Sequence, residues 1–362
     1  MCHVEYATPA LTEGIFLRTR SRYLKHPLGA RLKTPILIPS FSSKGFDLPQ
    51  FREGKQGYSE VSRYLHIFGP SLTEIFLISG YDIHHDLLER ARSLTSPQHF
   101  GNSVWATPHI LFLDSGLYEF RLRSDSEEAV QEMRLPQDWC EKDYVALVDR
   151  LPHWAPIAVV NWDRYGPYGD QVVAAQTFFA AHKNFLSVFL LKPEHQGSFH
   201  DLVQLGAQAT RLSAFDVIGV AEKELGDSVL ERMGAVAQLH DLLIRAGVDA
   251  PIHIFGALDP LYTPLYFAAG AEIFDGLSWL RYFWQNGVAV HRASLSVLMR
   301  IPEKEHGRAI EIAQSENLDR MAQLRRRLIN FHKEGGDWSV FSGQKEVLED
   351  AFRDMESTLE GN

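Results

Sequence analysis

Cysteine is scarce in this sequence, and long apolar runs are missing. The 362 residues include two cysteines, Cys2 and Cys140, which are too few for a disulfide framework or a cysteine-based zinc site. No uninterrupted apolar stretch reaches the roughly 18 residues of a membrane span. The first residues, MCHVEYATPALTEG, contain no apolar signal core. These absences predict a protein of the reducing cytoplasm, with no metal site and no membrane association.

Positive charge is also in deficit. Against 46 acidic residues stand 36 Lys and Arg, which gives a formal net charge of −10. Because phosphate contacts need Lys and Arg, this balance alone does not predict a nucleic-acid-binding protein. A basic run at residues 320–333, RMAQLRRRLINFHK, departs from the average. It is typical of a phosphate-facing helix or of a solvated helix face, and we favour the second interpretation.

Short apolar runs rich in β-branched residues are abundant. Most of them are nearly continuous in apolar character, as expected for strands buried on both faces. The eight runs are residues 34–41, 74–79, 110–116, 157–163, 185–193, 215–221, 251–257 and 272–278. Helical patterns between them, at 170–182, 228–247 and 259–270, indicate alternating strands and helices. This alternation predicts an α/β fold, a closed (β/α)8 TIM-type barrel.

A doubly wound open sheet is the alternative fold, but PSFSSKG, after the first predicted strand, lacks its usual glycine-rich phosphate loop. Two long connections, at 44–72 and 117–156, follow the first and third predicted strands, where insertions usually shape substrate binding. After about residue 300 the pattern changes to charged helices. We therefore expect a barrel with long loop insertions over residues 1–300 and a C-terminal helical appendage over residues 301–362.

Three aspartates stand at the downstream ends of apolar strands: Asp114 in LFLDSGLYEF, Asp163 in IAVVNWDRY and Asp275 in AEIFDGLSWL. The strand-to-loop ends of a parallel barrel converge on one site, and a buried, unpaired carboxylate is costly. Asp-Ser-Gly and Asp-Gly are also ordinary turns, and Arg164 could simply pair with Asp163. Because Asp114 and Asp275 fall on the third and eighth predicted strands of one barrel, we favour catalysis for these two.

Several motifs follow the order in which one known family has them. ARLKTPILIPSFSSKG, IFLISGYDIHH and LFLDSGLYEF are similar to motifs on that family's first three strands, and the stretch AAGAEIFDGLSW to one that contains Gly-Val-Asp-Met-Phe-Asp. Over residues 30–290 the chain thus resembles the tRNA-guanine transglycosylases. That family has a (β/α)8 barrel and exchanges a base in a nucleic acid. The resemblance implies that Asp275 is the nucleophile and Asp114 the general acid/base.

The resemblance also implies a base-binding site beside these carboxylates. Asp163 stands where a family aspartate hydrogen-bonds the base, and FDVIGVAEKELGDS, at 215–228, stands where the family has its base-binding loop. The residues expected to bind the base are Asp163, Ser115, Gly116, Gly219, Val220, Ala221 and Lys192. Those expected to contact the nucleic acid are Arg281, Trp279 and Tyr282. Packing on neighbouring loops is the alternative for the aromatic residues, and His253, which alternates along a strand, is interpreted as a satisfied core histidine.

The chemistry of these residue types supports the resemblance. A carboxylate can trap the positive charge that builds on a sugar when its N-glycosidic bond breaks, and a carboxylic acid can protonate the departing base. The sequence departs from the family where the base is chosen, with Leu117 and Glu119 in place of Gly and Gln, VAEKE at 220–224, and no zinc subdomain. We infer glycosidic chemistry on a different base or a different nucleic acid.

The leading prediction is therefore a cofactor-free enzyme that cleaves a base–sugar bond, with DNA favoured over tRNA as its partner. It would be a glycosylase that uses water or an exchange enzyme that uses a free nucleobase. A bulky modified base, such as those of phage genomes, would explain the remodelled pocket. The alternatives are an enzyme that inserts a 7-deazaguanine into tRNA, a non-catalytic paralogue that pairs with a catalytic subunit, and an unrelated barrel hydrolase. The sequence leaves homo-oligomer formation open.

Overall fold

Eight parallel strands close into a barrel in the computed structural model, which describes residues 17–46, 59–88, 109–120 and 138–361. The strands are β3 (Ile36–Phe41), β4 (Ile75–Ser79), β5 (Ile110–Asp114), β6 (Ile157–Val160), β7 (Leu186–Leu191), β8 (Val217–Ala221), β9 (Ile252–Phe255) and β10 (Ile273–Gly276). Each predicted run contains one of them, and β10 pairs with β3 to close the ring. The (β/α)8 prediction is confirmed, and the open sheet is excluded.

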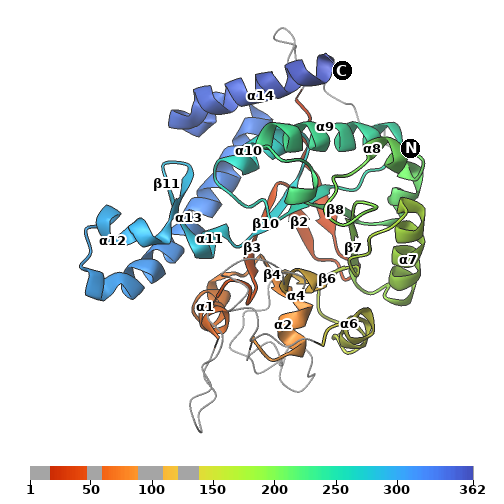
Figure 1. Ribbon diagram of the computed structural model, residues 1–362, viewed down its shortest axis with the longest axis horizontal. Helices are drawn as coiled ribbons and strands as arrows, with labels where there is room; N and C mark the ends of the chain where they lie inside the picture. The colour runs from red at the N-terminus through yellow and green to blue at the C-terminus, as the bar shows by residue number, and fades with distance from the viewer. Residues whose placement is uncertain (1–16, 47–58, 89–108, 121–137, 362) are drawn as a thin grey trace.

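Helices surround the strands (Figure 1). Those that precede the last strand are α1 (Glu60–Phe68), α2 (Gly80–His84), α4 (Leu117–Phe120), α6 (Glu141–Val148), α7 (Tyr168–Ala181), α8 (Leu202–Gly206), α9 (Val229–Arg245) and α10 (Tyr262–Ala268). The predicted start of α9 is confirmed, because Ser228 and Glu231 form a reciprocal capping box. Within the described residues, no helix combines the length and the apolar character that crossing a bilayer requires.

Apolar side chains of the strands alternate between two cores. On β3, for example, Ile36 and Ile38 fill the barrel interior, whereas Leu37 faces the surrounding helices. This two-residue period continues to the strand ends, where the inward positions become polar. On five strands, the last side chain that points into the barrel is therefore polar: Ser40, Ser79, Asp114, Lys192 and Asp275. The sequence thus fills most of the barrel interior with apolar side chains and places these five polar ones where the strands run into loops.

The segment after β10 begins with a short helix and a hairpin and continues into two long helices. These elements are α11 (Ser278–Arg281), β11 (Tyr282–Gln285), β12 (Val288–His291), α12 (Leu295–Leu298), α13 (His306–Lys333) and α14 (Lys345–Glu360). Leu328 and Phe331 of α13 and Phe352 of α14 belong to the same core as the barrel strands. The apolar core therefore continues across the domain boundary expected at residue 300.

A short hairpin and an ion-pair network tie the start of the described chain to the barrel. The hairpin pairs β1 (Tyr23–Lys25) with β2 (Arg31–Lys33), and its Leu24 and Leu32 close the interior core at the end where the strands begin. Arg18, which is almost fully buried, pairs with Asp241 of α9 and Glu356 of α14. The two ends of the described chain thus hold the same helix, α9, in place.

Candidate active site

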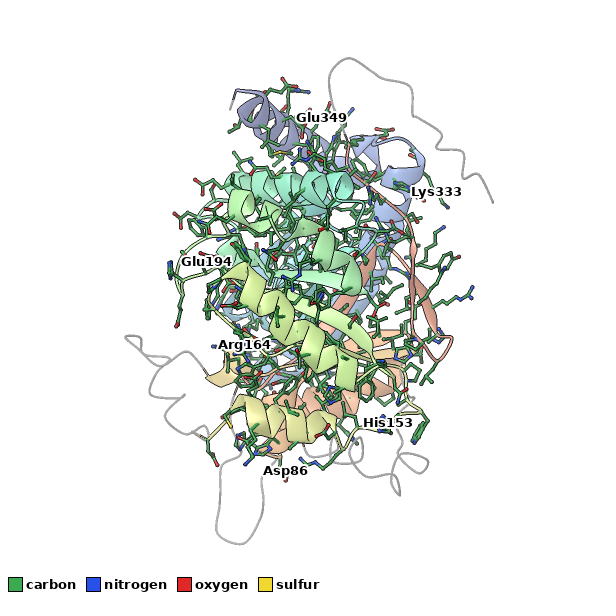
Figure 2. The ribbon with its side chains drawn as sticks, turned by 90° about the vertical axis from the view of Figure 1, so that its right-hand side faces the viewer. Asp86, His153, Arg164, Glu194, Lys333 and Glu349 are labelled. Carbon is green, nitrogen blue, oxygen red and sulfur yellow. The ribbon has the colours of Figure 1, made fainter. Side chains whose placement is uncertain are left out.

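The end of the barrel at which the strands run into loops is here called the mouth. In Figure 2, Arg164 and Glu194, which follow β6 and β7, lie on the left, and His153, which precedes β6, lies on the right. The three predicted aspartates are all at the mouth, since Asp114 ends β5, Asp163 follows β6 and Asp275 lies in β10. The barrel thus brings to one face carboxylates that are far apart in the sequence.

Asp275 is held in place by three neighbours. Ser40 Oγ donates a hydrogen bond to Oδ2 over 2.8 Å. The Gly256 N–H donates to Oδ1 over 3.1 Å, and His253 Nε2 lies 3.1 Å from the same oxygen. The residue is only 6% exposed, so the carboxylate has a fixed orientation in a nearly enclosed position. Fixed geometry of this kind is what a nucleophile in an active site requires.

His253 belongs to this site: it is a buried core histidine, as predicted, but only one of its two ring nitrogens has a hydrogen-bond partner. The side chain is fully buried and stacks on Phe255, with ring centroids 3.9 Å apart. Its Nε2 faces Asp275, but its Nδ1 has no hydrogen-bond partner within the described residues. A hydrogen on Nε2 would be donated to the carboxylate of Asp275. The sequence feature that could have identified His253 as a site residue is a polar side chain that points into the barrel from β9, the strand that pairs with β10.

Lys192 joins two carboxylates at the opposite side of the mouth. Its Nζ lies 2.7 Å from Glu224 Oε1 and 3.4 Å from Asp163 Oδ2. Ser115 Oγ donates to the other oxygen of Asp163 over 2.7 Å. Burial alone would lower the pKa of Lys192, but the two carboxylates outweigh it and hold that pKa well above its usual value. Three of the predicted base-binding residues, Lys192, Asp163 and Ser115, thus form one charged, hydrogen-bonded group.

Glu224, which the sequence analysis did not single out as a site residue, is the fourth member of this group. Its Oε1 accepts hydrogen bonds from Lys192 and, over 3.1 Å, from Tyr165 OH. Its Oε2 is buried and has no partner among the described residues. An unpaired buried acceptor of this kind costs about 1–3 kcal/mol, and an N–H donor of a bound ligand would satisfy it. Its position in the sequence could have identified Glu224 as a site residue, because the turn that contains it directly follows β8.

Tyr118 spans the mouth together with two lysines. The side chain follows β5 and is 43% exposed. Lys44 Nζ, from the loop after β3, lies 3.9 Å from the ring centroid, and Lys223 Nζ, from the turn after β8, lies 5.9 Å from it. These three strands are not neighbours in the barrel, so the contacts cross its opening. An aromatic ring with two ammonium groups can stack on a base and contact phosphates.

Two predicted contacts are wrong because the side chains lie in the core. Trp279 is fully buried, packs edge-on against Phe41 and Phe68, and donates its Nε1–H to the carbonyl oxygen of Ser40. The Val220 side chain faces the helices and belongs to the outer core, so it does not line a base pocket. In both cases apolar burial outweighs the position of the residue near a loop.

The remaining predicted residues lie at the mouth or close to it. Gly219 and Ala221 are at inward positions of β8, but a Cβ at Gly219 would lie 2.5 Å from the ring of Phe255, so that ring already covers the glycine. Arg281 is half-buried, and Tyr282 is 39% exposed at the start of the β11–β12 hairpin. Their contacts with nucleic acid stay predictions. Glu119 is a further departure from the family motif whose side chain lies outside the described residues.

Gly116 is required by the packing of the Asp114 turn. Its φ is +79°, and a Cβ there would lie 2.4 Å from Tyr81 Cβ. We expect Gly116→Ala to lower the free energy of unfolding by about 2–4 kcal/mol, since backbone strain and overpacking add. Gly197→Ala is the matched control, because its φ is +83° with open space around it, and should cost about 1 kcal/mol. Urea unfolding measures both, and equal losses would contradict a packing role.

His200, which lies next to this group, predicts a pH dependence of stability. Burial, with a smaller effect from Lys192, lowers the pKa of His200 to about 3. The unfolded chain takes up this proton near pH 6.5, so the stabilisation is present above pH 6.5 and is lost as the pH falls from 6.5 toward 3. Between pH 7 and pH 5 the loss from this residue is about 2 kcal/mol.

The measurement is urea unfolding at pH 7 and pH 5. His200→Gln should lose less stability than the parent protein over this interval. His195→Gln, which changes an exposed histidine in the same loop, is the control and should behave as the parent protein. A full acid loss retained in His200→Gln would contradict the assignment.

Comparisons with known proteins do not assign this chain to a family. No protein-family model matches the sequence, and no curated protein matches it. Among the described residues, no group of His, Cys, Asp and Glu could hold a metal ion. The side chains of the mouth therefore carry the chemical argument: the oriented carboxylate of Asp275, Asp114 at the end of β5, and the group around Lys192.

Proposed function

We propose that this protein cleaves the N-glycosidic bond of a nucleobase in nucleic acid, with a modified base in DNA as the favoured substrate. The observation that carries the proposal is the carboxylate of Asp275, enclosed at the mouth and oriented by Ser40, His253 and Gly256. A carboxylate with fixed orientation suits attack on an anomeric carbon. The motif order that resembles the tRNA-guanine transglycosylases supports the same reaction.

In the proposed reaction, an oxygen of Asp275 forms a bond to C1′ of the sugar as the bond from C1′ to the base breaks. The electron pair of the broken bond leaves with the base, which takes a proton from the carboxyl group of Asp114. Asp114 then removes a proton from water, and the resulting hydroxide displaces Asp275 from C1′. The products are the free base and an abasic site. A second base in place of water would give exchange instead.

The group around Lys192 supports a base as the leaving group. Asp163 and Glu224 offer carboxylate oxygens to N–H donors, and the ammonium group of Lys192 can donate to a carbonyl or ring nitrogen. Tyr118 offers an aromatic face at the entrance, where an extruded base could stack. Acceptors, a cationic donor and an aromatic ring together suit a flat heterocycle with a mixed hydrogen-bonding edge.

The test is base release measured by mass spectrometry. The protein is incubated with plain DNA, with modified phage DNA and with bulk tRNA, each with and without added guanine or 7-deazaguanine. Free base from DNA without an added base, together with abasic sites, is the expected result. Release that requires a second base would establish exchange, and release from tRNA alone would favour the transglycosylase alternative. If no base is released from any substrate, the proposal is overturned in favour of a non-catalytic subunit.

A further inference from the structure

The basic run of α13 is divided between structural roles and a cavity. Arg325 donates to the backbone carbonyls of Lys33 and Pro35, which anchors the helix to the barrel. Arg326 is exposed to solvent, whereas Arg327 is half-buried and lines a cavity beside the helix. The run is therefore neither a uniform solvated face nor a uniform basic surface, and its arginines can be examined one at a time.

This cavity, here called the α13 cavity, has a volume of about 510 Å³. It lies between α13, the turn that joins β11 to β12, and the residues just before α14. Its polar lining includes Arg320, Arg327, Gln285, Gln323 and Gln344, and no Asp or Glu is among its lining residues. In a chain whose net charge is −10, a cavity with two arginines and no lining carboxylate is unusual. Its charge favours an anion.

Two side chains of the cavity, Arg327 and Trp284, offer donors that no group of the described protein accepts. Arg327 makes no hydrogen bond or ion pair within the described part of the chain. Trp284 is 1% exposed, and its Nε1–H has no hydrogen-bond partner there. Buried donors are normally satisfied, so an acceptor from a ligand is expected. An anion with several acceptor oxygens meets the requirements of a free guanidinium group and an unpaired indole N–H.

Arg320 gives this cavity a rigid wall. Its guanidinium group donates to the carbonyl oxygen of Trp284, pairs with Glu316 over 2.7 Å and lies 4.3 Å from the ring centroid of Phe283. These three contacts fix Arg320 and leave Arg327 as the cation that can adjust to a ligand. The hairpin that forms one side of the cavity follows the strand of Asp275 in the chain, with α11 between them.

We propose that the α13 cavity binds a phosphate group, supplied by the backbone of the nucleic acid whose base enters the mouth. The proposal rests on the proposed function for the source of the phosphate, but the chemistry of the cavity stands on its own lining residues. Phosphate carries both the negative charge and the acceptor oxygens that Arg327 and Trp284 lack in the protein. Such a contact would position the strand and would not read its sequence.

The test compares Arg327→Ala with Arg326→Ala, which removes the same charge from the adjacent, exposed position of one helix. Binding of a short single-stranded DNA is measured by fluorescence anisotropy over a series of salt concentrations. We expect Arg327→Ala to weaken binding about fivefold at low salt and to reduce the salt slope by about 0.7, the value for one phosphate contact on a single strand. Arg326→Ala should leave both nearly unchanged. Equal effects of the two variants would overturn the proposal.

A second arm separates the sources of phosphate. Titration calorimetry with inorganic phosphate at constant ionic strength should show binding that Arg327→Ala loses and Arg326→Ala keeps. If Arg327→Ala weakens the binding of inorganic phosphate but not that of DNA, the cavity binds free phosphate, and the proposal that the nucleic-acid backbone supplies the phosphate is wrong. Neither arm needs base release. An absence of base release together with binding that depends on Arg327 would reject the proposed function and retain the phosphate site.

Discussion

Replacement of Asp275 by asparagine is expected to reduce base release at least about a thousandfold, which corresponds to about 4 kcal/mol in the barrier. An amide has nearly the same shape as the carboxylate but is a far weaker nucleophile toward C1′. Its oxygen can still accept hydrogen bonds from Ser40 or Gly256, so the fold should remain intact. Mass spectrometry of the released base measures the effect, and thermal unfolding measures the fold.

Asp249→Asn is the matched control for this variant. The Asp249 side chain is 94% exposed and precedes β9, at the end of the barrel opposite the mouth. The same chemical change at that position should leave base release at the parental rate. Release by Asp275→Asn at the rate of the control would reject Asp275 as the nucleophile, even if the protein proves to be a glycosylase.

Replacement of Lys192 by methionine is expected to lower the free energy of unfolding by about 3–5 kcal/mol. The change removes the only cation that contacts both Asp163 and Glu224 in the described structure, and it leaves the buried carboxylate of Glu224 near the partly buried one of Asp163. Methionine fills much of the same volume, so lost packing contributes little. Urea unfolding at neutral pH gives the value.

Two further variants locate the origin of this loss. Lys183→Met changes an exposed lysine just before β7, the strand that Lys192 follows, and should cost less than about 0.5 kcal/mol. The double variant Lys192→Met with Glu224→Gln should recover part of the stability, because one buried charge is removed with its partner. A loss in Lys192→Met no larger than that in Lys183→Met would show that the buried charges do not depend on this lysine.

The strands could be predicted from the sequence because barrel strands are buried on both faces and therefore read as continuous apolar runs. The same pattern predicts that the side chains of Asp114 and Asp275 point into the barrel. Successive side chains of a strand alternate between its two faces, so the face of each residue can be counted along the sequence. The helices after residue 300 were harder to place. Most of their residues are charged or polar. The few apolar residues that join the barrel core, such as Leu328 and Phe352, therefore do not stand out in the sequence.

Partners contributed by other strands could not be predicted. The importance of His253 depends on the register between β9 and β10, and that of Glu224 on the reach of Lys192 from β7 to the turn after β8. Trp279 was misplaced for the same reason, because its burial depends on Phe41 and Phe68. Local patterns show which way a side chain faces, whereas tertiary packing decides what it meets.

The place of Asp275 in the barrel has a consequence for synthesis of the protein. Its strand, β10, is the last of the eight to emerge, and it closes between β3, which supplies Ser40, and β9, which supplies His253. A nascent or truncated chain that ends before β10 lacks the proposed nucleophile, Asp275, and leaves Ser40 and His253 without the carboxylate that they orient. The proposed cleavage therefore requires the complete ring, and fragments or stalled chains that lack β10 are expected to be inactive.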